Sequence, residues 1–164
     1  KVKLDSKETG GSLFDKLSGV GAALLVKTLD ELEKGTVKPV KQNETEATHV
    51  KMLDKSFGNI DFSMEAARIE RLIRGLNPWP SAFTHFNGKL LKIWDADVCD
   101  DVVCESGESV VNGMITQVDN NSFIVKCGDN SLKINELQLE GKKRMKTQDF
   151  LRGNHINTGD ILGK

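Results

Sequence analysis

The sequence is short of several features that would restrict its class. Its 164 residues include no tyrosine, three prolines and three cysteines. No apolar run approaches the roughly 18 residues that a membrane helix needs, and the N-terminal residues show no signal-peptide pattern. We therefore expect no membrane partner. An odd number of cysteines without secretory features predicts reduced thiols and a cytoplasmic protein.

Charge is balanced along the whole chain, so no large basic domain is present. The formal net charge is −1, and lysine plus arginine against aspartate plus glutamate gives 6 to 6 in residues 1–35, 7 to 6 in 36–81 and 10 to 12 in 82–164. A nucleic-acid surface, if the chain has one, must be a local patch. We expect no DNA partner. What is present is a mixed pattern of helical and strand periodicity.

The N-terminal part reads as one amphipathic helical segment. Ser12 can cap it and Gly35 can end it. We expect a kink or two short helices, because Gly19 and Gly21 fall inside and each costs about 1 kcal/mol against alanine. The segment carries an apolar stripe that needs a partner surface: Leu13, Leu17, Val20, Leu24, Leu25, Leu29 and Leu32. The stripe could fold back on the rest of the chain or pair with a second copy.

A linker-like stretch, residues 36–47, separates this segment from a second helix. Asp61 or Ser63 is the expected cap of that helix, which runs to about Leu76. Pro78 and Pro80 disfavour the helical conformation for the residues before them, so the helix must stop there. We interpret Trp79, held between the two prolines, as core packing at a junction.

After Pro80 the apolar period changes from that of a helix to that of strands. Asn87-Gly88 between two alternating runs is a strong hairpin signal, because both residues tolerate the positive φ angles of a type I′ turn. We expect strands at residues 82–86, 89–94, 113–118, 122–127 and 131–139, and Thr147 as the cap of a short helix over 148–152. Short strands joined by tight turns predict a small antiparallel barrel.

Several stretches together resemble one known family. They are ETGGSLFDKL (8–17), GTVKPVK (35–41), IRGLNPWP (73–80), GKLLKIW (88–94) and LQLEGKKRM (137–145). In this order they resemble the C-terminal half of methionyl-tRNA formyltransferases. The resemblance covers nearly the whole chain, and opening on Lys1 instead of methionine suggests a piece of a longer protein. No stretch matches the family's catalytic motifs, so no catalytic residue is carried over.

The resemblance implies an α+β fold with three parts. Residues 1–35 would be the helical remnant of the family's α/β catalytic domain, 36–60 the linker, and 61–164 a tRNA-binding domain. That last domain would be a small antiparallel OB-like barrel, with one helix before it and a short helix near its end. The apolar stripe between Leu13 and Leu32 would face the catalytic domain, and in its absence we expect self-association of the isolated chain.

The same resemblance implies an enzyme of translation initiation. The complete protein would move a formyl group from 10-formyltetrahydrofolate to initiator methionyl-tRNA. This chain alone would bind no cofactor, have no activity and help to hold the tRNA. Two alternatives stay open. One is the C-terminal domain of a related small-substrate formyltransferase or formyltetrahydrofolate hydrolase, and the other is a non-enzymatic RNA-binding module.

The strongest candidate for RNA contact is a basic run after the last long strand. Lys142, Lys143, Arg144 and Lys146 lie within five positions, in a turn opened by Gly141, and such a cluster can neutralise phosphates. A solvated turn is the plain alternative, and the resemblance favours tRNA contact. Lys38 and Lys41 in the linker are further candidates. Arg68, Arg71 and Arg74 on the second helix are weaker ones, because any surface helix would present them.

Other chemistry-bearing residues do not form a recognisable site. Cys99 and Cys104 lie near several aspartates, but without a second cysteine pair or a nearby histidine we predict no metal site. The three histidines suggest no catalytic triad. Cys127 sits in an alternating strand and is expected in the core. We also expect Trp94 in the core, although OB-like barrels can stack bases on such aromatics.

Overall fold

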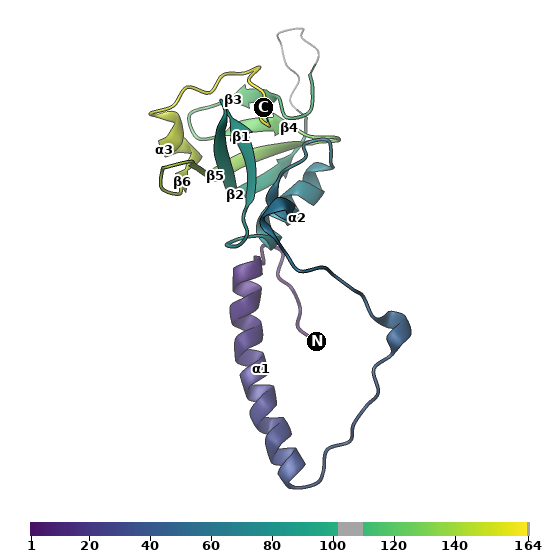
Figure 1. The fold of residues 1–164 in the computed structure, drawn as a ribbon. Coiled ribbons are helices and arrows are strands. Elements are labelled where there is room, and N and C mark those ends of the chain that lie inside the picture. The colour runs from purple at the N-terminus through teal and green to yellow at the C-terminus, as the bar shows by residue number, and fades with distance from the viewer. Residues whose placement is uncertain (102–109, 164) are drawn as a thin grey trace.

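The structure is a computed structural model that describes residues 1–101 and 110–163. A sheet with two small helices forms one body, from which a long helix, α1, projects (Figure 1). A linker containing two 3-10 turns, η1 (Glu44–Glu46) and η2 (Lys55–Gly58), returns from the far end of α1 to the sheet body. The order of helix, linker and sheet agrees with the expected α+β class.

Helix α1 (Gly10–Glu33) is continuous over 24 residues, so the expected kink is wrong. Gly19 and Gly21 do not interrupt the helix. Each costs about 1 kcal/mol against alanine, and the many leucines and other good helix formers around them offset this cost. The expected cap is also one turn off. Thr9 is the N-cap, and it forms a reciprocal capping box with Ser12. Gly35 follows the helix with a φ of +64°, which supports its expected role as the stop.

The apolar face of α1 has no cover in the described part of the chain. No residue of the helix is buried there, and Leu24 is 60% exposed. Contact with the sheet body is made at the first turn, where the Gly11 N–H donates to the carbonyl of Asn77 at 2.9 Å. A Cβ at Gly10 would lie 2.4 Å from the Gly75 carbonyl oxygen, so this close approach requires glycine.

Six strands form one antiparallel sheet in the described residues, in the order β1-β2-β5-β4-β3, with β6 paired to β5. Asn87 and Gly88 connect β1 to β2 with φ angles of 51° and 73°, as the hairpin prediction requires. β2 extends five residues beyond its expected end at Trp94. These residues are held in the sheet because β5 pairs with β2 as far as Cys99. The strands are β1 (Ala82–Phe86), β2 (Lys89–Cys99), β3 (Ile115–Val118), β4 (Phe123–Lys126), β5 (Ser131–Leu139) and β6 (Met145–Lys146).

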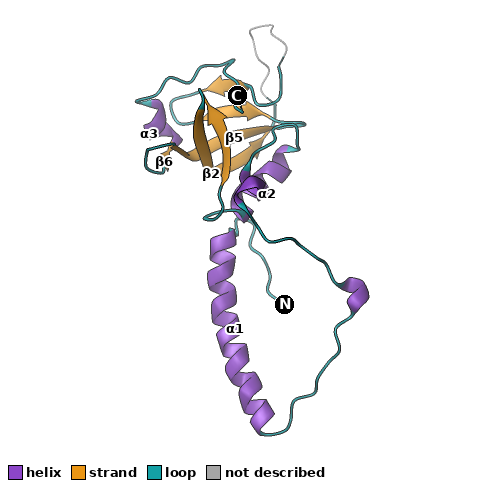
Figure 2. Ribbon diagram, viewed as in Figure 1, coloured by secondary structure: helices purple, strands orange, loops and turns teal. Residues whose placement is uncertain are grey.

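The sheet curls without closing by strand pairing (Figure 2). Its two end strands, β1 and β3, are not paired with each other in the described residues. The C-terminal segment runs between them: the Gly163 N–H donates to His85 O and the Leu162 N–H to Gly113 O, both at 2.9 Å. The expectation of a barrel is therefore met only in part, as a mixed fold with one antiparallel sheet.

Helix α2 (Ala66–Gly75) packs against β2 and closes one side of the core. Its apolar stripe buries Ile69 and Ile73 as the period predicts, whereas the expected start is wrong. Asp61 does not cap α2, because its carboxylate accepts from the Ser63 N–H before the helix begins. The helix begins at Ala66, whose N–H donates to the Asp129 carboxylate at 2.8 Å. A cap from 63 residues away leaves no local sequence signal.

Two further expectations at chain joints are corrected. Helix α3 (Thr147–Leu151) starts at Thr147 itself, which is buried, and Lys146 occupies the cap position. Trp79 is 60% exposed instead of lying in the core. Leu76 and Pro80 fill the core at that joint, and the Trp79 ring lines a surface depression beside the start of α1.

Candidate nucleic-acid interface

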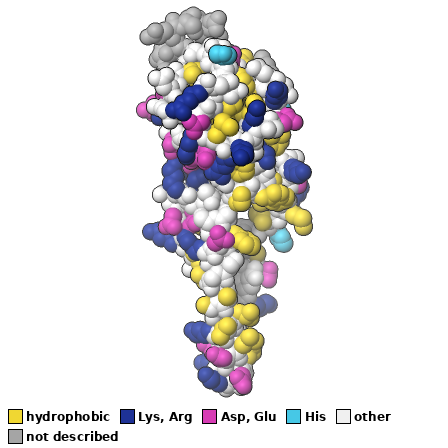
Figure 3. All heavy atoms as spheres, turned by 90° about the vertical axis from the view of Figure 1, so that its left-hand side faces the viewer, with side chains coloured by type: hydrophobic (Ala, Val, Ile, Leu, Met, Phe, Trp, Pro, Cys, Tyr) yellow, Lys and Arg dark blue, Asp and Glu magenta, His cyan; other side chains and the backbone are white. Residues whose placement is uncertain are grey.

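The four cations of the basic run, Lys142, Lys143, Arg144 and Lys146, are brought together on an outer face of the sheet body. We call them the basic turn. They lie between the end of β5 and the start of α3, and all four are exposed. On this face, lysine and arginine side chains gather over the sheet body, interspersed with some acidic ones (Figure 3). The predicted cluster is therefore accessible as a unit.

Arg144 differs from its lysine neighbours because the fold holds it in place. Its guanidinium lies 4.8 Å from the ring centre of Trp94 and pairs with the carboxylate of Glu136. Lys92 lies 5.7 Å from the same ring. The ring is half-buried and flanked by cations, so the expectation that Trp94 belongs to the core is wrong. A cation over an indole face is favourable, and this contact orders Arg144 on the surface.

A hydrogen-bonded bridge links this stack to the tip of the turn. The indole Nε1–H of Trp94 donates to the Gln138 side-chain oxygen at 3.3 Å. The Gln138 amide nitrogen donates in turn to the backbone carbonyl of Lys142 at 2.9 Å. The turn that carries the lysines is thus anchored to β2 and β5, and its charges are presented by a fixed backbone.

The three lysines of the basic turn keep their charge available. Within residues 1–101 and 110–163, neither Lys142 nor Lys143 has an acidic partner within 4.0 Å. Lys146 lies 4.0 Å from Glu136, and its side chain remains 65% exposed. Ammonium groups on flexible stems act as point charges that suit phosphate oxygens and do not read base edges by a fixed fork.

The other candidate cations are not part of this cluster. Lys38 and Lys41 are exposed on the linker, in the stretch that leaves the far end of α1 (Figure 1). Arg68 and Arg71 are exposed on α2. Arg74 has a structural role, because it donates to the Glu70 carboxylate at 2.6 Å and to the backbone carbonyl of Glu8 at 2.8 Å.

The sequence reasoning missed the residues that support the basic turn. Lys92 and Trp94 lie two positions apart on one strand, and so do Glu136 and Gln138, so each pair was readable as sharing a face. Which strands are neighbours was not readable. The pairing of β2 with β5 places Lys92 opposite Gln138 and brings the two pairs together.

Metal and thiol chemistry have no support in the described residues. There, no group of three or more histidine, cysteine, aspartate or glutamate side chains is arranged to hold a metal ion. Cys104 lies outside the described residues. Cys127 is fully buried, as expected, and burial raises the pKa of its thiol to about 12. In the same described ranges, no helix is long and apolar enough to cross a membrane.

Comparison with known proteins points to one family. Residues 52–155 match the formyl transferase C-terminal domain. The chain is 61% identical to the methionyl-tRNA formyltransferase of Lachnospira eligens, over 100% of this chain and 52% of that protein. It is 42% identical to that of Halothermothrix orenii, over 99% of this chain and 52% of that protein. The chain thus spans about half the length of these curated relatives.

Solved structures agree with this fold at low sequence identity. A crystal structure of a HypX variant from Aquifex aeolicus matches 97% of this chain and 31% of that protein, with a TM-score of 0.59 and 15% identity. HypX in complex with tetrahydrofolic acid matches 84% of this chain and 26% of that protein, with a TM-score of 0.52 and 14% identity. At such identity the likeness concerns the fold alone.

Proposed function

Since the chain belongs to the formyl transferase family and carries its C-terminal domain, we propose that it is the tRNA-binding half of a methionyl-tRNA formyltransferase. The observation that carries this proposal is the 61% identity to one such enzyme over every residue of the chain. The complete protein would transfer a formyl group from 10-formyltetrahydrofolate to initiator methionyl-tRNA in the cytoplasm, for translation initiation. A small-substrate relative or a free-standing RNA-binding module is not favoured by these relatives.

Within that enzyme the chain would supply positioning. The basic turn offers exposed ammonium groups on an anchored backbone, which suits a polyanionic partner. Holding the tRNA so that its acceptor end enters a catalytic domain would make a bimolecular step effectively unimolecular. Lys142, Lys143 and Lys146 would contact phosphates, and Lys38 and Lys41 would add weaker contacts along the linker. Arg144 would add a contact whose direction is fixed by Trp94 and Glu136.

We assign the parts of the chain accordingly. Residues 1–35 would belong to the catalytic α/β domain, 36–60 to the linker and 61–164 to the tRNA-binding domain. An OB-like barrel is a suitable description of the last part. Backbone bonds from Leu162 to Gly113, just before β3, and from Gly163 to His85 in β1 support it, because they bridge the two ends of the sheet.

The exposed stripe of α1 would lie against the catalytic domain in the full-length protein. Leu17, Leu24 and Leu32 are all about half exposed here, and a large apolar face drives association. We expect the isolated chain to self-associate through α1. Light scattering should show a dimer or larger species that a Leu17→Ser, Leu24→Ser, Leu32→Ser variant loses. A monomer at high concentration would contradict this.

Formyl transfer tests the proposed function. The full-length protein, supplied with 10-formyltetrahydrofolate and methionyl-tRNA, is expected to produce formylmethionyl-tRNA. The 164-residue chain alone should give none, since no catalytic motif of the family lies on it. Turnover by the isolated chain above a no-protein control would contradict the proposal that the catalytic residues lie outside this chain. A full-length protein that formylates only a small amine or hydrolyses the donor would contradict the proposal that methionyl-tRNA is the substrate.

A further inference from the structure

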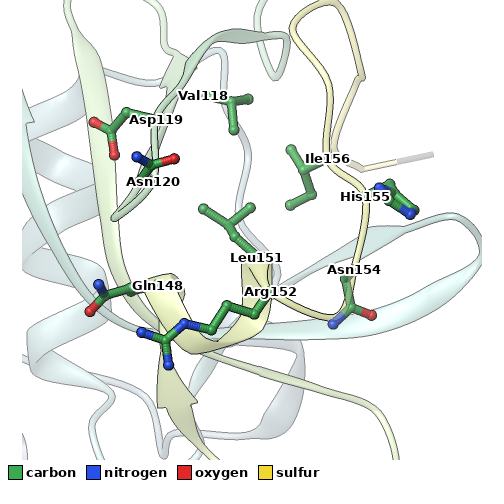
Figure 4. Close-up of a pocket in the computed structure, with 9 residues that line it drawn as sticks. All are labelled: Val118, Asp119, Asn120, Gln148, Leu151, Arg152, Asn154, His155 and Ile156. Atoms are coloured by element: carbon green, nitrogen blue, oxygen red, sulfur yellow. The ribbon is translucent and has the colours of Figure 1, made fainter.

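A cavity of about 500 Å³ opens beside the basic turn, between the β3–β4 turn and α3 (Figure 4). Such a volume is within the range of small-ligand sites. The cavity is adjacent along the chain to the lysines of the basic turn, because α3 begins at Thr147, directly after Lys146. Nothing assigned above uses it.

The cavity has an apolar floor and a polar rim. Val118, Leu151 and Ile156 point toward one another at its centre. Asn120 and Gln148 stand at one side of this floor, and His155 and Arg152 stand at other points of the rim. The floor is built from residues that pack on the core, so it does not depend on a ligand for its shape.

The rim groups have hydrogen-bonding capacity to spare. In the described ranges, the side chains of Asn120, Gln148 and His155 make no hydrogen bond within the chain. Arg152 pairs with Asp149 at 3.1 Å, and both side chains are more than half exposed, so this pair is easily replaced. The rim thus offers amide donors and acceptors together with two planar groups, an imidazole and a guanidinium.

The carboxylate on this rim, Asp119, is already hydrogen-bonded within its own turn, so the cavity is poorly suited to bind a cation. Asp119 accepts from the N–H groups of Asn121 and Ser122 at 2.6 and 2.7 Å and from the Ser122 hydroxyl at 3.0 Å. These bonds lower the pKa of Asp119 and hold it inside its own turn. The remaining polar groups are neutral or positive, and they surround an apolar surface.

We propose that this cavity binds an unpaired nucleobase of the tRNA that the basic turn holds by its phosphates. A base has a flat apolar face for the floor and an edge of donors and acceptors for Asn120 and Gln148. Bases splayed out of loops and ends are recognised in this way, by stacking on histidine or arginine planes and by amide contacts to their edges. The inference rests on the proposed function, since the lysines must first bring RNA to this face.

The test compares two triple variants of the full-length protein in tRNA binding. Asn120→Ala, Gln148→Ala, His155→Ala removes the neutral rim, and Arg152 is retained so that no permanent charge changes. The matched control, Asn121→Ala, Gln117→Ala, His49→Ala, removes the same residue types from exposed positions outside the cavity. Unfolding midpoints equal to wild type would show that both variants are folded.

The rim variant is expected to bind initiator tRNA about tenfold more weakly, with an unchanged slope of log affinity against log salt. In chemical probing of the bases, at least one unpaired base protected by wild type should become reactive with the rim variant and stay protected with the control. A rim variant with wild-type affinity and wild-type protection would overturn the inference. If the wild-type protein itself binds no tRNA, the proposed function fails, whereas wild-type binding that the rim variant keeps in full overturns this inference alone.

Discussion

A full-length protein with Lys142→Ala, Lys143→Ala and Lys146→Ala is expected to bind tRNA about a hundredfold more weakly near 0.15 M salt. Each lost phosphate contact removes the release of nearly one counterion, which is worth about fivefold at that salt concentration. The slope of log affinity against log salt should flatten by about 2–2.5, because each of the three contacts contributes about 0.7–0.9. Initiator and elongator tRNAs should be affected alike, since phosphates carry no sequence information.

A charge-matched control keeps this result interpretable. Lys27→Ala, Lys34→Ala, Lys55→Ala removes three exposed lysines that lie away from the basic turn. Filter binding or fluorescence titration over a range of salt concentrations should give this control the wild-type affinity and slope. If both triple variants lose affinity equally, net charge would be the cause and the basic turn would be an ordinary solvated turn.

Gly128→Ala is expected to lower the unfolding midpoint of the chain by about 10 °C or more, which corresponds to about 2–3 kcal/mol in a domain of this size. A Cβ at Gly128 would lie 2.2 Å from the backbone oxygen of Ser63. The neighbouring loop would have to move, which would break the bond from the Gly128 N–H to Met64 O and disturb the Asp129 cap on α2.

Gly19→Ala makes the same chemical change where there is room for it. Apart from the adjacent residues and the backbone of α1 itself, no described atom lies within 4 Å of a Cβ placed there. Helix α1 should gain about 1 kcal/mol, visible as higher helix content in circular dichroism, while the midpoint of the sheet body stays unchanged. A Gly128→Ala variant as stable as wild type would mean that the β4–β5 turn does not hold α2 in place.

The sequence predicted most elements whose signals are local. Asn87-Gly88 predicted the hairpin because positive φ angles are demanded at two specific positions, and β5 was predicted with its observed bounds. The apolar period predicted which face of α2 is buried. Gly35 predicted the end of α1, since a left-handed residue there ends a helix without steric cost.

The errors arise where a residue distant in the sequence determines the local structure. Asp129 caps α2 from another turn, so the choice between Asp61 and Ser63 as the cap could not succeed. Residue type places Trp79 and Trp94 in the core, but Trp79 is 60% exposed and Trp94 is half-buried with Arg144 over its ring. For the same reason the stack of Arg144 on Trp94 had no signal in the order of the residues.

The basic turn illustrates how far a candidate site can be predicted from the chain alone. Its four cations were named from their spacing, and all four are exposed together. The sequence could not separate Arg144, which is tied to Trp94 and Glu136, from Lys142 and Lys143, which lack acidic partners in the described part of the chain. That division depends on the pairing of β5 with β2 on one side and with β6 on the other.

Lysine acylation with and without bound initiator methionyl-tRNA is the most direct measurement of whether this half of the enzyme grips tRNA through the basic turn. The full-length protein is labelled under both conditions, and modification is quantified at each lysine by mass spectrometry. Bound tRNA should protect Lys142, Lys143 and Lys146 strongly and leave Lys27, Lys34 and Lys55 unchanged. Equal labelling of the basic turn in the two conditions, at a tRNA concentration that saturates the protein, would contradict the account.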